Sequence, residues 1–132
     1  MILLDSSFII ALYNSRDERH QDAQKLIKEI ANREFGDVFI SDYVFDEVAT
    51  GLARCIGHDE AVRICQLLLD STYLTKVTEP IFRGSFEMFR KQKSKLSFTD
   101  CTNVVIMEDS GIKNIATFDS DFKSINYVNV VQ

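Results

Sequence analysis

Acidic side chains at four places in the sequence have the residue type and spacing that best fit catalytic chemistry. Asp5 follows the apolar run 2–4, Asp119 follows the apolar run 115–117, and Glu47 and Asp100 lie in segments with helical spacing of apolar residues. Carboxylates that gather in one site raise one another's pKa unless cations neutralise them. An all-oxygen site without His or Cys predicts hard Mg2+ or Mn2+ ions, which activate water for phosphodiester hydrolysis.

Each of these acids also has a simpler structural explanation. Asp5 would cap the helix that follows it, and Ser97 with Asp100 has the spacing of a capping box. Asp119 would form an Asx turn, and Glu47 would be an exposed helical residue, although it borders an apolar helix face. A shared metal site has the advantage of explaining all four positions at once.

The elements that must position these acids alternate between short apolar strands and amphipathic helices. Such alternation predicts an α/β fold with a parallel sheet, in which ligand sites lie at the carboxyl ends of the strands. Asp5 directly follows one predicted strand, Asp119 lies in the segment after another, and residues 118–122 are expected to form a loop. The strands are predicted at 2–4, 38–40, 74–77, 114–117 and 127–131, and the helices at about 6–12, 17–32, 42–55, 59–71, from Pro80 onward, and at 97–110.

Composition favours one ordinary domain covering residues 1–132. The chain has 45% hydrophobic and 27% charged residues, with no low-complexity run that would mark a linker. Its net charge of -5 argues against general binding of polyanions, so a nucleic-acid function needs metal ions to offset the acids.

Other classes of function lack the residues they need. The five glycines lie too far apart for a dinucleotide or nucleoside triphosphate loop. No apolar run approaches the roughly 18 residues of a membrane span, and the N-terminal residues lack a basic leader, so a cytoplasmic protein is expected. Cys55, Cys65 and Cys101 fall in apolar helical patterns and are expected to be buried free thiols.

Four short motifs, in order along the chain, resemble the PIN-domain family. They are Leu3-Leu4-Asp5-Ser6-Ser7, Asp46-Glu47-Val48-Ala49-Thr50-Gly51-Leu52, Leu96-Ser97-Phe98-Thr99-Asp100 and Ala116-Thr117-Phe118-Asp119-Ser120-Asp121-Phe122. The sequence departs from the family in two places, because Cys101 stands where alanine is common and segment 111–114 is less apolar than usual.

The resemblance implies a three-layer α/β/α sandwich with a mainly parallel central sheet, similar to flavodoxin and Rossmann folds. It also implies a ribonuclease that depends on Mg2+ or Mn2+, most similar to the VapC-type toxins of toxin-antitoxin pairs. By that resemblance Asp5, Glu47, Asp100 and Asp119 are the acids of the metal site and of catalysis, Ser7 and Thr117 support them by hydrogen bonds, and Asp121 is a more distant fifth acid. The implied partners are an RNA substrate, an antitoxin whose tail covers the acidic site, and a second copy of the chain.

A cluster of cations precedes the segment that carries Asp100. Arg90, Lys91, Lys93 and Lys95 are the best candidates for contacts to RNA phosphates, with a solvated helix end as the alternative. In the preceding helix, the helical spacing of Phe82, Phe86 and Phe89 favours a core face over a platform for base stacking.

Three other functions remain open. A phosphotransfer receiver or aspartate-nucleophile phosphatase also has an acid after its first strand. Such proteins have a second acid two residues later, where this chain has Ser7. A solitary PIN-domain nuclease of RNA processing would carry the same motifs as a toxin. A non-catalytic PIN-like binding module would have lost an acid, whereas all four are present.

Overall fold

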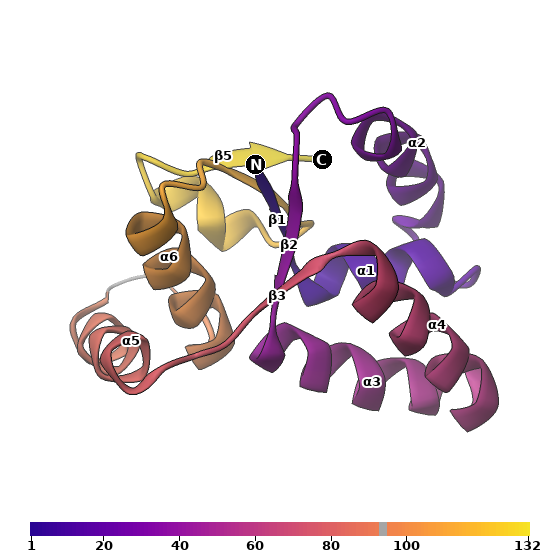
Figure 1. Cartoon of the computed structure of the whole chain (residues 1–132), viewed down its shortest axis with the longest axis horizontal. Coiled ribbons are helices and arrows are strands. Elements are labelled where there is room, and N and C mark those ends of the chain that lie inside the picture. The colour runs from indigo at the N-terminus through magenta and orange to yellow at the C-terminus, as the bar shows by residue number, and fades with distance from the viewer. Residues whose placement is uncertain (93–94) are drawn as a thin grey trace.

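The computed structural model describes residues 1–92 and 95–132, and its centre is a parallel sheet of five strands (Figure 1). The strand order is β3-β2-β1-β4-β5, so the first strand of the chain lies at the centre of the sheet. In the register of the sheet, Leu3 of β1 is paired with Phe39 of β2 and with Ile115 of β4. The strands are β1 (Ile2–Leu4), β2 (Val38–Ser41), β3 (Tyr73–Thr75), β4 (Asn114–Ala116) and β5 (Asn129–Val131).

Helices cover both faces of this sheet, which confirms the predicted three-layer sandwich (Figure 1). Alternation along β1 explains the two layers, because Ile2 and Leu4 belong to one buried cluster and Leu3 to the other. The first cluster packs against α1 (Ser6–Tyr13), α2 (His20–Ala31), α3 (Asp42–Ile56) and α4 (His58–Ser71), and the second lies on the side of α5 (Glu79–Lys91) and α6 (Phe98–Ser110).

The carboxyl ends of β1 and β4 bring two distant parts of the chain together. The backbone N–H of Asp5 donates to the carbonyl of Ala116 at 3.0 Å, which extends the pairing of the two strands by one residue. Asp5 then caps α1, and a short 3-10 helix, η1 (Ser120–Ser124), begins after Asp119. The residues that follow β1 and those that follow β4 are therefore neighbours at one edge of the sheet.

The start of α2 and the turn before η1 differ from the sequence prediction for the same reason. Helix α2 begins at His20 rather than near Asp17, because the Asp17 carboxylate accepts the backbone N–H of Arg19 in a turn. Residues 118–122 are not all loop, because the Asp119 carboxylate accepts the N–H of Asp121 and starts η1. Local side-chain hydrogen bonds therefore decide both boundaries.

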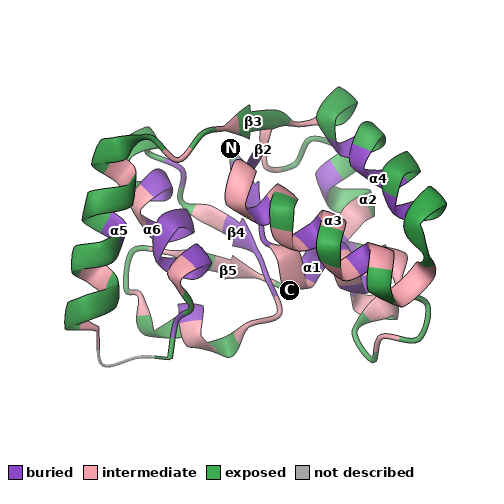
Figure 2. Cartoon of the chain, turned by 90° about the horizontal axis from the view of Figure 1, so that it is seen from below, coloured by how far each residue is buried: buried purple, intermediate pink, exposed green. Residues whose placement is uncertain are grey.

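The prediction that Phe82, Phe86 and Phe89 form a core face is wrong. These side chains of α5 are 44%, 51% and 44% exposed, and α5 is largely exposed in Figure 2. Helix α5 packs against α6 on a different face, where Ser85 is buried and Gly84 lies against Val105. No other helix of the described residues covers the phenylalanine face, although the Phe82 and Phe89 rings contact the ring of Phe98.

The cysteines have the free thiols that the sequence predicts, with one difference in burial. Cys65 and Cys101 are buried, whereas Cys55, near the end of α3, is only partly buried. Among the described residues, no helix combines the length and the apolar character needed to cross a membrane.

Candidate active site

Asp5 is a buried carboxylate, only 2% exposed, at the centre of the sheet edge. Its Oδ2 accepts hydrogen bonds from Ser7 Oγ at 2.6 Å and from Thr117 Oγ1 at 2.8 Å. Burial raises the pKa of Asp5 above its ordinary value, although these hydrogen bonds act in the opposite direction. The site thus holds a carboxylate whose charge is poorly compensated by the protein itself.

Ser7 and Thr117 also fix the chain that follows β4. Thr117 Oγ1 accepts the backbone N–H of Asp119 at 3.0 Å, and Ser7 Oγ accepts the N–H of Phe118 at 3.0 Å. Each hydroxyl therefore donates to Asp5 and accepts from the loop that carries Asp119. The two supporting residues inferred from the sequence connect two of the predicted acids.

Asp100 forms the capping box expected from the sequence and also lies close enough to other acids to feel their charges. Its Oδ2 accepts the N–H of Ser97 at 2.7 Å while Ser97 Oγ accepts the N–H of Asp100, so the capping box is formed. The pKa of Asp100 is raised to about 6, mainly by burial and to a smaller extent by the charges of Asp5 and Asp119, whereas the hydrogen bonds from Ser97 act in the opposite direction. Capping and clustering are therefore compatible, and three of the four acids interact electrostatically.

Asp119 and Asp121 lie together at the start of η1. Asp119 Oδ1 accepts the N–H of Asp121 at 2.8 Å, which is the Asx turn expected of a loop acid. Both side chains are partly buried. Asp119 is the nearer of the two to the cluster, since it contributes to the shifted pKa of Asp100.

Glu47 lies near the middle of α3 and contacts the residue that follows Asp5. Its Oε2 accepts a hydrogen bond from Ser6 Oγ at 2.8 Å, which connects α3 to the first turn of α1. Gly51, one turn later, allows this close approach, because a Cβ there would stand 2.8 Å from Ile10 Cδ1. A larger residue at position 51 would therefore require the Ile10 side chain to move.

The donor set fits divalent cations, although no three His, Cys, Asp or Glu side chains of residues 1–92 and 95–132 converge closely enough to hold one as they stand. None of the ion pairs in this part of the chain includes Asp5, Glu47, Asp100 or Asp119. Carboxylates that are buried, mutually repelling and without a cationic partner are what a hard metal ion would neutralise.

The PIN domain family model matches residues 2–126 of the sequence. The chain belongs to the PIN-domain family. It is 33% identical over 132 residues to the 23S rRNA-specific endonuclease VapC20 of Mycobacterium tuberculosis, covering 98% of both chains. The crystal structure of that protein, described as a sarcin-ricin loop cleaving toxin, matches with a TM-score of 0.85 at 30% identity over 97% of both chains. A toxin-antitoxin complex from Klebsiella pneumoniae shares the fold, with a TM-score of 0.72 at 17% identity over 100% of this chain and 97% of that one.

Asn103 is a residue of this PIN domain that the sequence reasoning missed. It is fully buried on α6, one turn after Asp100, where its Nδ2 donates to Asp5 Oδ1 at 3.4 Å. Its Oδ1 accepts from Ser41 Oγ at 3.2 Å, so it links the end of β2 to Asp5. A lone amide among the apolar residues 104–107 was the available signal, because buried polar groups are normally paired.

We expect Asn103→Leu to destabilise the PIN domain by about 2 kcal/mol. The leucine has a similar shape but leaves Asp5 and Ser41 without their amide partner in a buried setting. Urea denaturation in metal-free buffer measures the loss. Asn32→Leu, at an exposed position after α2, is the control and should change stability by less than about 0.5 kcal/mol. Equal stability of the two variants would show that the amide does not support Asp5.

The basic cluster lies apart from these hydrogen bonds. Arg90 and Lys91, in the last turn of α5, both form ion pairs with Glu87, at 2.7 and 3.2 Å. Lys95 is exposed, and Lys93 lies outside the described residues. The contacts that the structure gives to Arg90 and Lys91 are within their own helix, as expected of a solvated helix end.

Proposed function

We propose that this PIN domain is a divalent-metal-dependent endoribonuclease and the toxin of a VapBC-type pair. The observation that carries the proposal is the set of acids at the carboxyl edge of the parallel sheet, which form no ion pair with any cation of residues 1–92 and 95–132. There the charges of Asp5 and Asp119 both contribute to the raised pKa of Asp100. The similarity to VapC20 over nearly the whole chain supports the same activity.

In the proposed mechanism, Asp5, Asp100 and Asp119 hold Mg2+ or Mn2+, which would supply an activated water and stabilise the leaving oxygen. Ser7 and Thr117 orient the Asp5 carboxylate through their hydroxyls. Glu47 is partly exposed and held by Ser6, so it can orient the attacking water or accept its proton. The repulsion among the acids favours binding of cations over the empty site.

The substrate that we propose to test first is a loop of the large ribosomal RNA. VapC20 is named as a 23S rRNA-specific endonuclease, and its crystal structure is described as that of a sarcin-ricin loop cleaving toxin. An exposed loop with unstacked bases is the kind of RNA that proteins read specifically.

The deciding experiment is cleavage of bacterial 23S rRNA by the purified protein with Mg2+, with Mn2+ and with EDTA. We expect one or a few cleavage products with either metal and none with EDTA. Glu47→Gln should lower the rate by roughly 100-fold, whereas Asp46→Asn, on the exposed side of the same helix, should leave it within about twofold. Cleavage that persists in EDTA, or that Glu47→Gln does not slow, would overturn the proposal.

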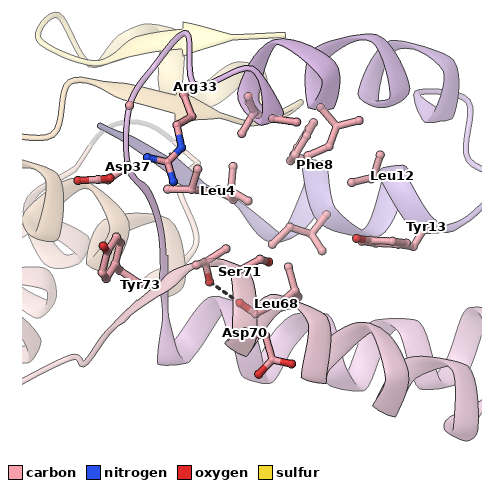
Figure 3. A pocket seen from close by; sticks show the side chains of 17 residues that line it. Leu4, Phe8, Leu12, Tyr13, Arg33, Asp37, Leu68, Asp70, Ser71 and Tyr73 are labelled. Carbon is pink, nitrogen blue, oxygen red and sulfur yellow. Dashed lines mark hydrogen bonds between the residues drawn. The ribbon is translucent and has the colours of Figure 1, made fainter.

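We propose that the antitoxin contacts an apolar groove on the α1, α2 and α4 side of the sheet, shown in Figure 3. The groove has a volume of about 510 Å³, and Leu12, Tyr13, Ile27 and Leu68 are among its lining residues. The exposed rim carries Arg33 and other polar groups. This chemistry suits an amphipathic segment of a partner protein. The groove includes none of the four acids.

We further propose that the exposed face of Phe82, Phe86 and Phe89 contacts a second copy of the chain. Exposed apolar patches on soluble proteins commonly mark interaction surfaces. The ion pairs Glu79–Arg83 and Glu87–Arg90 alternate in sign along α5, so an antiparallel copy of the helix would place opposite charges face to face. Light scattering of the purified protein measures the oligomeric state.

A further inference from the structure

A cleft of about 650 Å³ lies directly beside the acidic cluster. One wall is formed by the first turn of α1 with Ser6 and Ser7, and another by Phe118, which precedes Asp119. The connection between α1 and α2 forms the third wall and contributes two cations, Arg16 and Arg19. The sequence alone predicts RNA contacts only in the segment 90–95.

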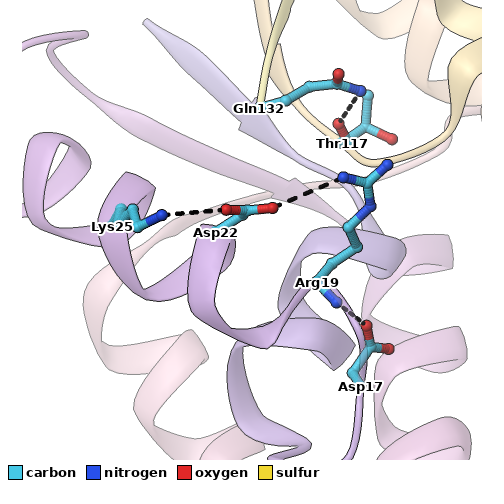
Figure 4. A network of polar contacts seen from close by, with 6 residues as sticks. All are labelled: Asp17, Arg19, Asp22, Lys25, Thr117 and Gln132. Carbon is cyan, nitrogen blue, oxygen red and sulfur yellow. Dashed lines mark hydrogen bonds and ion pairs between the residues drawn. The ribbon is translucent and has the colours of Figure 1, made fainter.

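Arg19 is the cation that reaches closest to the acid-bearing loop. Its guanidinium carbon lies 5.7 Å from the centre of the Phe118 ring. In Figure 4 its side chain extends from the start of α2 toward the end of β4, where Thr117 lies. Since Phe118 stands between Thr117 and Asp119, this contact places a positive charge next to the candidate metal site.

The guanidinium of Arg19 keeps most of its hydrogen-bonding capacity. Its contact with Asp22 is 3.7 Å long, and it donates no hydrogen bond within the described residues. The backbone, by contrast, is fixed, because the Arg19 N–H donates to Asp17 Oδ1 at 2.8 Å. Arg16 differs, since its Nη2 already donates to the carbonyl of Cys55 at 2.8 Å.

The same cleft also contains two acids, Asp17 and Glu18, so its lining has no formal net charge and the donors of Arg19 carry the argument. Asp17 uses one oxygen for the Arg19 backbone, and Glu18 is exposed. A planar guanidinium with unused donors, beside a site built to attack a phosphodiester, has the geometry for recognition of phosphate oxygens.

We propose that Arg19 binds a backbone phosphate of the RNA adjacent to the scissile one. This inference rests on the proposed function, since it assumes an RNA in the acidic site. Arg19 is thereby a positioning residue. Its expected effect is on RNA affinity and KM, whereas kcat should change less than twofold.

The test measures binding of a fluorescein-labelled RNA hairpin that copies the sarcin-ricin loop, over a range of salt concentrations. All proteins carry Asp100→Asn and are studied in EDTA, so that no cleavage interferes. Loss of one phosphate contact lowers the slope of log affinity against log salt by about 0.7 to 1. We expect this decrease for Arg19→Gln, with about five- to tenfold weaker binding at moderate salt.

Two further variants make the result specific. Arg19→Lys keeps the charge and should retain most of the slope. Lys113→Gln removes an exposed cation just before β4, at the opposite edge of the sheet, and should change neither slope nor affinity. An unchanged slope for Arg19→Gln, or no RNA binding by any of the proteins, would overturn the inference.

The outcome is independent of the cleavage experiment. If Arg90→Gln lowers the slope and Arg19→Gln does not, the RNA backbone runs along α5 and the inference fails while the nuclease proposal stands. If 23S rRNA is not cleaved with any metal but Arg19→Gln still weakens binding, the nuclease proposal fails and the phosphate contact remains.

Discussion

Asp100→Asn is expected to lower the rate of RNA cleavage about 100-fold or more in saturating Mg2+. The substitution preserves the capping hydrogen bond, because the amide oxygen can still accept the N–H of Ser97. It removes one of the three carboxylates whose charges interact at the sheet edge. The expected loss therefore comes from metal binding and not from a broken helix start. Single-turnover cleavage of 23S rRNA measures it.

The matched control is Asp109→Asn on the same helix. Asp109 is exposed near the end of α6, about ten residues from the cluster, so its removal changes the net charge equally without touching the site. We expect cleavage within about twofold of the parent protein. If both variants cleaved at the parental rate, Asp100 would have no place in the metal site.

The same Asp100→Asn substitution is expected to stabilise the metal-free protein at pH 7. The folded protein holds the pKa of this carboxyl at about 6, above the ordinary value of 3.8. The displacement corresponds to at most about 3 kcal/mol of destabilisation at neutral pH. Partial solvation and the lost charge at the start of α6 reduce the net gain to about 1 kcal/mol, or a few degrees in Tm.

The stability gained by Asp100→Asn over the parent protein should increase with pH. Because the pKa of Asp100 is raised in the folded protein, the folded state binds the proton more tightly than the unfolded chain does. This contribution to stability is fully present below pH 3.8 and is lost as the pH rises through about 6. The Tm difference between variant and parent should therefore be small near pH 4 and reach its maximum above pH 6.

Thermal unfolding in EDTA at several pH values measures this difference, and addition of Mg2+ provides the second half of the test. Mg2+ should raise the Tm of the parent protein at pH 7 more than that of Asp100→Asn, because only the parent has the complete set of acids. A parent protein that is more stable than the variant in EDTA at pH 7 would contradict the account of the site as a repulsive cluster.

Sequence reasoning located the acids because their positions follow from simple rules. Acids at or a few residues beyond the carboxyl end of an apolar strand lie near the sheet edge in a parallel α/β fold, which predicts the positions of Asp5 and Asp119. The capping box predicted at Ser97 and Asp100 is present, and it coexists with the clustering of the acids. Asp100 therefore both caps a helix and belongs to the acidic cluster. The short motif around it cannot show that the two roles coexist.

Residues that act through long-range contacts were missed. Asn103 contacts Asp5 across 98 positions in the chain, and Ser6 contacts Glu47 across 41. Arg19 approaches Phe118 only because α1 and α2 are folded against the same side of the sheet as the loop after β4. Such contacts depend on how the helices and strands pack together. The spacing of residues within one short segment carries no information about that packing.

The prediction that the phenylalanines of α5 form a core face failed for a related reason. Their spacing correctly describes one face of α5, but periodicity does not tell whether a second element covers that face. Likewise, Leu69 of α4 is 43% exposed, because the buried side of that helix runs through Ala61, Ile64 and Leu68.

The central position of β1 has a consequence for how the protein folds. The first strand of the chain must pair with β2 and also with β4, whose partner residues lie 112 positions later, before the sheet is complete. Pairings over such long separations are slow to form, because the loop must close before any contact stabilises it. Since Asp5 and Asp119 meet only when β4 docks on β1, a folding intermediate that lacks this pairing cannot have assembled acids. Nuclease activity should therefore appear in refolding experiments only with the final phase, after most of the helical signal has returned.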